Sequence, residues 1–279
     1  MKLSFLNFWG DFDPNNNFFI HLLKSYKENV QVVSPERADN IIYTCFGQEH
    51  LNYNNCNKIF YTGENIRPNF GECNGALSFD IDDHGGKNVR LPLWMLYIDW
   101  FNVGSYGNPN GLVPISKINN NRFKNRLKTK TCCIVVNHLG NNRNIIMNKL
   151  QQHFSVDGKG KPFNNWDYGE DLKYNFISDY KFNICFENTI YPGYHTEKLF
   201  HAKIAGCIPL YNGSTTIDSD FNPKCFLNLQ DFSNIENFIS KILEINSSDR
   251  LYKEIYEQPL FNTEPSLEDT FNKVNKLFL

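Results

Sequence analysis

One stretch of this 279-residue chain, residues 181–212, constrains its fold more than any other. Residues 182–186 and 207–211 are short apolar runs of the length expected for buried strands. Between them, a Pro- and Gly-containing loop leads to a helical stretch, residues 197–205, which Thr196 can cap. Two buried strands joined by a helix are typical of a βαβ unit in a parallel sheet.

Polar side chains crowd the point where the first of these strands ends and the helix begins. They are Glu187, Asn188, Tyr194, Glu197 and Lys198. Open parallel sheets bind ligands at the carboxyl edge of their strands, and a helix N-terminus presents unpaired N–H groups to anions. The stretch therefore predicts an anion site at this edge.

The rest of the chain repeats the alternation of apolar runs and helical stretches. Strands are predicted at residues 3–9, 30–33, 41–46, 58–62, 131–136 and 226–229. We expect a helix that opens at Pro14, and a loop over the Gly-rich residues 157–169. A basic polar stretch before residue 131 suggests a boundary between two Rossmann-like α/β domains, 1–125 and 126–279, with the final helix able to pack back on the first. Two such domains with parallel sheets facing across a cleft form the GT-B arrangement.

Two cations lie at predicted helix starts, where cations are disfavoured by the helix dipole. Arg143 follows the strand at 131–136, and Lys198 lies in the first turn after Thr196. The alternatives are a solvated surface arginine and an exposed Lys198–Glu197 ion pair worth ~0–1 kcal/mol. A diphosphate shared by both helix starts would offset the conflict, and two such positions favour that interpretation.

Glu64 lies in a polar loop after the predicted strand at 58–62. It is a candidate general base, a role that requires approach to a hydroxyl within ~2.6–3.2 Å. The alternative is a solvated loop acid that pairs with Arg67. Because Glu64, Arg143 and Glu187 each follow a predicted strand, all three are expected at carboxyl edges.

Composition excludes several classes of protein. With 41% apolar and 15% aromatic residues the chain can bury a large core, and a net charge of −2 gives no overall basic field for nucleic acid. The eight cysteines show no zinc spacing and indicate reduced thiols, as in a cytoplasmic protein. No stretch supplies the ~20 apolar residues of a membrane span, so we expect a soluble protein. The Asp80-Ile81-Asp82 triplet resembles a metal-binding DxD, but it is interpreted as a solvated turn, and no metal site is predicted.

Several motifs together carry a resemblance to a known family. The run FENTIYPGYHTEKLFHAKIAGCIPLYNG, residues 186–213, resembles the donor-binding signature of the family 10 glycosyltransferases, the α-1,3/4-fucosyltransferases. Five further segments are similar to other motifs of this family: NFWGD at 7–11, IFYTGENIRPNF at 59–70, VRLPLWM at 89–95, NNRNIIMNKL at 141–150 and DFNPKCFLNLQDF at 220–232. These motifs recur in order at compatible spacings over nearly the whole chain, so the resemblance is specific and extends to soluble bacterial members.

The resemblance implies a GT-B enzyme that transfers L-fucose from GDP-fucose with inversion, without an obligatory metal or other cofactor. It implies that the N-terminal domain binds the acceptor and the C-terminal domain binds the donor. By the same resemblance, Glu64 is the general base, and Glu197 stabilises positive charge on the fucose. The implied donor-binding residues are Arg143, Glu187, Asn188, Tyr194, Glu197 and Lys198, and the implied acceptor-side residues are Trp9 and Asp11. His195 stands where the family usually has Val. One interpretation is that it alters the pH dependence near the donor, and the other, which we favour, is a tolerated exposed side chain.

The sequence thus predicts fucose transfer to a hydroxyl of a GlcNAc-containing glycan, at O3. The expected partners are GDP-fucose and the glycan acceptor, without nucleic acid or a transmembrane segment, while peripheral membrane contact stays open. Two alternatives remain: a GT-B transferase of another nucleotide sugar, and a non-catalytic glycan-binding protein that kept the fold. Asn-, Lys- and Ile-rich composition indicates an AT-rich genome, bacterial or viral.

Overall fold

A computed structural model describes residues 1–109, 111–118, 127–140, 142–165 and 170–278. The chain divides into two compact units, the first formed by Met1–Pro114 with Pro265–Leu279 and the second by Ile115–Glu264. The chain first passes from one unit to the other after Pro114, and the boundary predicted at residue 125 falls outside the described residues.

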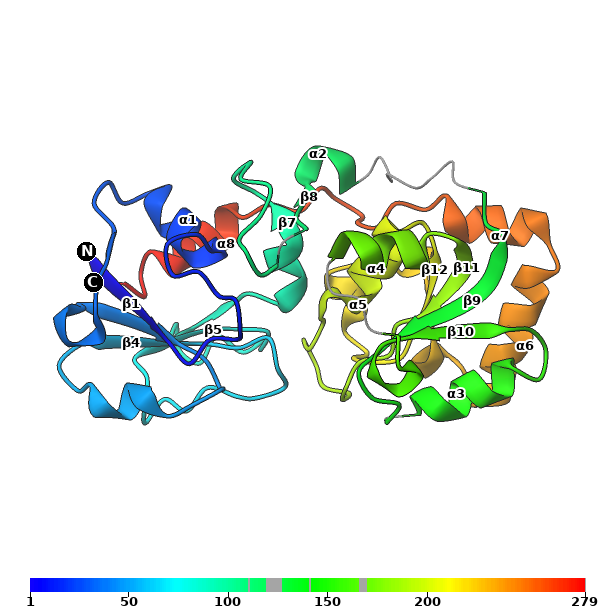
Figure 1. The fold of residues 1–279 in the computed structure, drawn as a ribbon, viewed down its shortest axis with the longest axis horizontal. Helices are drawn as coiled ribbons and strands as arrows, with labels where there is room; N and C mark the ends of the chain where they lie inside the picture. The colour runs from blue at the N-terminus through cyan, green and yellow to red at the C-terminus, as the bar shows by residue number, and fades with distance from the viewer. Residues whose placement is uncertain (110, 119–126, 141, 166–169, 279) are drawn as a thin grey trace. The chain divides into compact units, whose positions relative to one another are not determined.

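The first unit is built on a six-stranded parallel sheet, drawn in blue to cyan in Figure 1. Its strands are β1 (Lys2–Leu6), β2 (Gln31–Val32), β3 (Asn40–Tyr43), β4 (Asn57–Tyr61), β5 (Gly75–Ser78) and β6 (Asn88–Arg90). They lie in the order β2-β1-β3-β4-β5-β6, and every pair is parallel. Because the chain passes from β1 to β2 on one side and then to β3 on the other, the strand order reverses between β1 and β3. Ligands bind at such switch points in open α/β sheets.

Helices cover this sheet, and the end of the chain returns to it. They are α1 (Phe18–Lys24), α8 (Glu268–Val274) and the 3-10 helices η1 (Pro35–Arg37), η2 (Glu49–Asn52) and η3 (Leu93–Tyr97), with a small pair of strands, β7 (Ile98–Asp99) and β8 (Val113–Pro114). The helix predicted to open at Pro14 begins four residues later, because the side chain of Asn17 accepts the N–H of Ile20 and caps it there. In α8, Val274 is buried and packs within the first unit.

The second unit is built on a five-stranded parallel sheet, in the order β10-β9-β11-β12-β13. Its strands are β9 (Lys130–Val135), β10 (Val156–Lys159), β11 (Tyr180–Ile184), β12 (Ile208–Tyr211) and β13 (Leu227–Asn228). Its helices are α2 (Ile115–Ile118), α3 (Arg143–Leu150), α4 (Glu170–Ile177), α5 (Glu197–Ile204), α6 (Ile235–Asn246) and α7 (Asp249–Tyr256), with 3-10 helices η4 (Lys161–Phe163), η5 (Ile217–Ser219), η6 (Pro223–Cys225) and η7 (Leu229–Asp231). Here the order reverses between β9 and β11, which is the second switch point.

One strand of this sheet contradicts the sequence prediction. Residues 157–159 were expected to form part of a Gly-rich loop, yet with Val156 they form β10 and pair in parallel with β9. Val156 is buried in the core, so tertiary pairing overrides the weak strand propensity of Asp157 and Gly158.

The core of the second unit explains why most of its strands could be predicted from apolar runs in the sequence. Apart from β10, its strands are mainly apolar because helices cover both faces, and α6 presents Phe238, Ile239 and Ile242 to the sheet. The eight cysteines are free thiols, and most of them are buried. In the described part of the chain, no helix combines the length and apolarity needed to cross a bilayer.

Candidate active site

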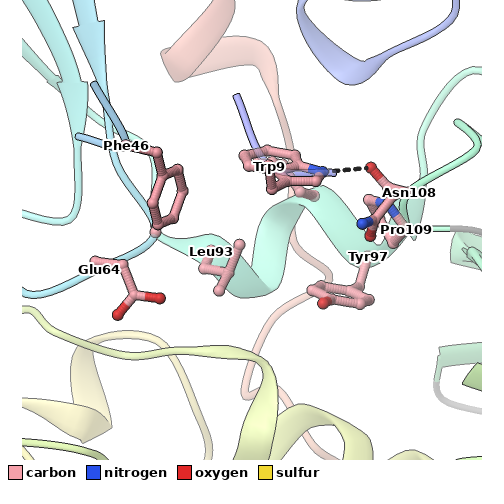
Figure 2. Close-up of a pocket in the computed structure, with 9 residues that line it drawn as sticks. Trp9, Phe46, Glu64, Leu93, Tyr97, Asn108 and Pro109 are labelled. Carbon is pink, nitrogen blue, oxygen red and sulfur yellow. Dashed lines mark hydrogen bonds between the residues drawn. The ribbon is translucent and has the colours of Figure 1, made fainter. Parts of the chain in front are cut away.

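A pocket of about 180 Å³ lies at the switch point of the first unit. Trp9 follows β1, Phe46 follows β3 and Glu64 follows β4, so the pocket collects side chains from three neighbouring strand ends. It is lined by Trp9, Phe46, Gly63, Glu64, Leu93, Leu96, Tyr97, Asn108 and Pro109. Figure 2 shows the aromatic rings arranged around Leu93, with the carboxylate of Glu64 beside it.

Trp9 is held in place by neighbours from distant parts of the first unit. Its indole Nε1 donates a hydrogen bond to the backbone oxygen of Asn108 at 3.2 Å. Its ring meets Tyr61 edge-on, with 6.3 Å between centroids. An anchored aromatic ring beside a carboxylate suits a sugar, which presents both hydroxyls and an apolar face.

Glu64 offers an exposed carboxylate at the mouth of this pocket. A local turn places it, because its backbone N–H donates to Thr62 Oγ1 at 2.9 Å and that hydroxyl donates to Glu64 O at 3.1 Å. The Nε of Arg67, the alternative partner suggested by sequence, lies 3.5 Å from Asp80 Oδ2.

Two aspartates of the first unit, Asp80 and Asp11, were singled out in the sequence. Asp80 is only 8% exposed and also contacts His84 Nε2 at 3.2 Å, so the solvated-turn interpretation is wrong for this residue. Asp11 is exposed, has a φ of 62°, and lies outside the pocket lining. Over the described residues, no group of three His, Cys, Asp or Glu side chains is arranged to hold a metal.

The second switch point holds a smaller cavity, of about 40 Å³. The ends of β9 and β11 form its floor, while α4 and α5 contribute its charged side chains. Lining residues are Val135, Val136, Lys173, Ile177, Asn183, Ile184, Cys185, Phe186, Glu197, Lys198 and His201. The structure therefore brings Glu197 and Lys198 together at the edge predicted for an anion.

Arg143 opens α3 and is buried, with only 2% of its surface exposed, so the solvated-arginine alternative is wrong. Its Nε and Nη2 donate to the backbone oxygen of Phe186 at 3.3 and 2.7 Å, and Nη2 also donates to Asn188 Oδ1 at 2.7 Å. Nη1 donates to His138, at ring Nδ1 (3.1 Å) and backbone O (3.2 Å). Burial lowers the pKa of Arg143 from its high usual value, and Glu187 opposes that shift.

Glu187 caps α5 from the neighbouring strand end. Its Oε1 accepts the backbone N–H of Thr196 at 2.8 Å, and its Oε2 accepts the Thr196 hydroxyl at 2.7 Å. Thr196 was expected to cap the helix with its own side chain, but it makes no such bond because its hydroxyl is committed to Glu187. A carboxylate at a helix N-terminus also interacts favourably with the dipole.

Lys198 lies between two carboxylates. Its Nζ is 3.3 Å from Glu187 Oε2 and 3.7 Å from Glu197 Oε1, and it donates to Thr196 Oγ1 at 2.9 Å. Burial would lower the pKa of Lys198, but Glu187 and Glu197 outweigh it and raise the pKa. Burial would raise the pKa of Glu197, but Lys198 and Lys173 hold it at about 2. Both groups are therefore ionised at neutral pH, in a setting more buried than a surface ion pair.

The loop before α5 is held in place by polar contacts with other residues of the second unit. Tyr194 is buried, and so is His195, which contradicts the expectation of an exposed histidine. His195 Nδ1 lies 2.7 Å from Asp220 Oδ2, and its Nε2 lies 3.3 Å from Thr216 Oγ1. That hydroxyl also accepts the N–H of Gly193 at 2.9 Å, so the loop is tied to the segment after β12.

Sequence reasoning missed several residues of both pockets. Phe46, Leu93, Tyr97 and Asn108 line the first, and Lys173 and His201 line the second. Phe46 could have been predicted as a pocket residue, because an aromatic residue just beyond a strand end can face a ligand. His201 and Lys173 could not have been predicted in this way, because in sequence each is one polar residue among several in a helical stretch.

Two parallel α/β units, each with a pocket at its switch point, are the architecture of the GT-B class of glycosyltransferases. Two family models match this chain: the α-(1,3)-fucosyltransferase FucT N-terminal domain over residues 3–97, and the glycosyltransferase family 10 (fucosyltransferase) C-terminal domain over residues 125–259. The chain belongs to glycosyltransferase family 10, as its motifs indicated.

Individual relatives agree with this assignment. The chain is 31% identical to α-(1,3)-fucosyltransferase FucT of Helicobacter pylori over 93% of its own length and 60% of the relative's. It is 31% identical to α-(1,3)-fucosyltransferase B of Drosophila melanogaster over 42% of its length and 29% of the relative's. A crystal structure of an α1,3-fucosyltransferase with GDP-fucose covers 99% of this chain and 89% of that one, with a TM-score of 0.77 at 25% identity. The GT-B prediction is thus confirmed. The chain spans less than two thirds of the length of each of these two curated relatives.

Proposed function

We propose that this protein is an inverting fucosyltransferase that moves L-fucose from GDP-fucose to a hydroxyl of a glycan, at O3 of GlcNAc. One observation carries the proposal: an exposed carboxylate and an anchored tryptophan share a pocket at one switch point, while cations and a carboxylate gather at the other. The first unit would bind the acceptor, and the second unit would bind the donor.

Arg143 and Lys198 serve the diphosphate of the donor. Lys198 lies at a helix start, where both its ammonium and the helix dipole favour an anion. Because the guanidinium of Arg143 already binds Phe186 and Asn188, we expect it to act through its charge and by orienting Asn188. These groups stabilise the negative charge that GDP gains as it departs.

The acceptor reacts in a single displacement. Glu64 takes the proton of the acceptor hydroxyl as its oxygen bonds to the anomeric carbon of fucose. The bond from that carbon to the phosphate oxygen breaks, and GDP leaves with the electron pair. Trp9 would hold the acceptor sugar beside Glu64, with Asp11 nearby in sequence and exposed.

Glu197 stabilises the positive charge that develops on the fucose ring. Its pKa of about 2 keeps the carboxylate charged at every pH at which the enzyme would work. Since cations of the chain itself face the leaving group, we expect no obligatory metal ion or other cofactor.

Tyr194 and Glu187 have supporting roles in this proposal. Both are buried, so Tyr194 would shape the wall of the donor site, and Glu187 would fix the start of α5. Glu187 thereby sets the position of Lys198 and Glu197, rather than touching the nucleotide itself.

Two alternatives have specific counterarguments. A transferase of another nucleotide sugar would keep the same fold, but the donor motif resembles that of fucosyltransferases and a solved relative is described with GDP-fucose. A non-catalytic glycan-binding protein needs no general base beside its aromatic platform, yet Glu64 lies there.

A donor screen tests the proposal directly. The purified chain is incubated with lactose or N-acetyllactosamine and with GDP-fucose, GDP-mannose or UDP-galactose in turn. We expect glycan product with GDP-fucose alone. Faster transfer from either of the other donors would refute the assignment of the sugar, and binding of glycan without any transfer would favour the non-catalytic alternative.

A further inference from the structure

The charges assigned to the donor site by its motifs cancel one another. Arg143 and Lys198 supply two positive charges, and Glu187 and Glu197 supply two carboxylates beside them. The expected ligand is a nucleoside diphosphate, which is itself an anion. A balanced cluster would attract it only through the dipole of α5, so a further cation is needed to make the site positive.

Helix α4 brings such a cation to the same cavity. Lys173 lines it together with Glu197 and Lys198, and the Nζ of Lys173 lies 2.6 Å from Nδ1 of His201 on α5. Burial lowers the pKa of His201 well below its usual value, and Lys173 lowers it further. The imidazole is therefore neutral at pH 7, and its Nδ1 accepts a hydrogen bond from the Lys173 ammonium.

Neutral His201 holds Lys173 without removing its charge. Of the described side chains that line this cavity, Lys173 and Lys198 carry positive charge and Glu197 carries negative charge, which leaves one positive charge. The cavity also lies at the ends of β9 and β11, where the strand order reverses and ligands bind.

We propose that Lys173 is a third cation of the donor site, which makes this pocket attractive to the diphosphate of the nucleotide. This inference rests on the proposed function, because the ligand is the GDP part of the donor. In the purely structural alternative, Lys173 only holds α4 against α5 through His201. The two differ in one respect, since only a charge role depends on the phosphates of the ligand.

The test compares Lys173→Gln, Lys173→Arg and a matched control in the full chain. Gln keeps an N–H donor for His201 but removes the charge, and Arg restores the charge. Lys149→Gln is the control, because it removes the same charge from α3, where Lys149 pairs with Glu236 at 2.8 Å on the surface. Calorimetric titration with GDP and with guanosine separates phosphate recognition from base recognition.

For Lys173→Gln we expect the Kd for GDP to rise about tenfold, as for the loss of one charge-assisted contact. The affinity for guanosine should not change, and Lys173→Arg and Lys149→Gln should bind GDP within about threefold of the wild type. In turnover, the KM for GDP-fucose should rise while kcat stays nearly constant, because the charge binds ground state and transition state alike.

Unchanged GDP affinity in Lys173→Gln, or equal losses for GDP and guanosine, would overturn the inference. If Lys173→Gln does not fold, Lys173→Met and the effect of salt on GDP binding by Lys173→Arg provide the same comparison. A wild-type chain that binds GDP but transfers no fucose would refute the proposed function alone. Failure of the wild type to bind GDP would refute both.

Discussion

Glu187 lets the structure be tested without a catalytic assay. Its carboxylate is almost completely buried and accepts both the backbone N–H and the hydroxyl of Thr196, at 2.8 and 2.7 Å. Lys198 Nζ lies 3.3 Å away. We expect Glu187→Gln to destabilise the second unit and to weaken GDP binding, although Glu187 is not expected to touch the nucleotide.

The size of the destabilisation follows from the hydrogen bonds that the side-chain amide of the Glu187→Gln variant cannot accept. Gln offers one acceptor oxygen in place of two, so one of the two Thr196 donors loses its partner, and hydrogen bonds to charged groups contribute about 1.5–3 kcal/mol. The Lys198 contact is also lost, but the 21% exposure of that side chain allows solvent to compensate in part. Together these effects predict a loss of about 3 kcal/mol in the free energy of unfolding of the second unit.

Urea unfolding followed by circular dichroism, with and without GDP, measures both effects. Glu236→Gln is the control, since that exposed carboxylate pairs with Lys149 at the surface and its loss should leave the unfolding midpoint unchanged. If Glu187→Gln unfolds at the same urea concentration as the wild type and binds GDP equally well, the assigned capping role is wrong.

Three further predictions address pH, the donor loop and metals. Because the pKa of His201 is lowered in the folded chain, the unfolded chain binds a proton below pH ~6.5 that the folded chain does not. The free energy of unfolding should therefore decrease as the pH is lowered below ~6.5, by up to ~1.4 kcal/mol per pH unit. Urea midpoints at pH 7.5 and 5.5 check this, and His201→Gln should show a smaller difference. His195→Val takes the imidazole from the buried carboxylate of Asp220 and should raise the KM for GDP-fucose; Asp220→Asn in the same chain should recover part of the loss, and an unchanged KM would contradict the fastening role. Turnover should persist in EDTA, and complete loss that Mn²⁺ restores would overturn metal independence.

Much of the fold was predictable because it depends on local apolar periodicity. The strands around residues 58–62 and 182–186 could be predicted because parallel strands covered on both faces form mainly apolar runs. The strand β10 could not be recognised in this way, because Asp157 and Gly158 have low strand propensity and pair with Cys133 and Ile134, 24 residues away in sequence.

The candidate site was predictable only in part. Strand ends and family motifs pointed to Glu64, Arg143 and Lys198, and the structure places each at a carboxyl edge. The roles of Glu187 and His195 depend on hydrogen bonds between segments that meet only in the folded chain, and no periodicity reports them.

The central claim is that Glu64 activates the acceptor while a separate set of residues binds the donor, and one paired measurement tests it. Wild type and Glu64→Ala are compared for the rate of fucose transfer from GDP-fucose to N-acetyllactosamine and for the Kd of GDP. Because Glu64 is exposed and its described hydrogen bonds are made by its backbone, the variant should fold normally. We expect Glu64→Ala to transfer fucose about 10²–10⁴-fold more slowly with the GDP affinity unchanged; transfer at the wild-type rate would contradict the role of Glu64 as the base.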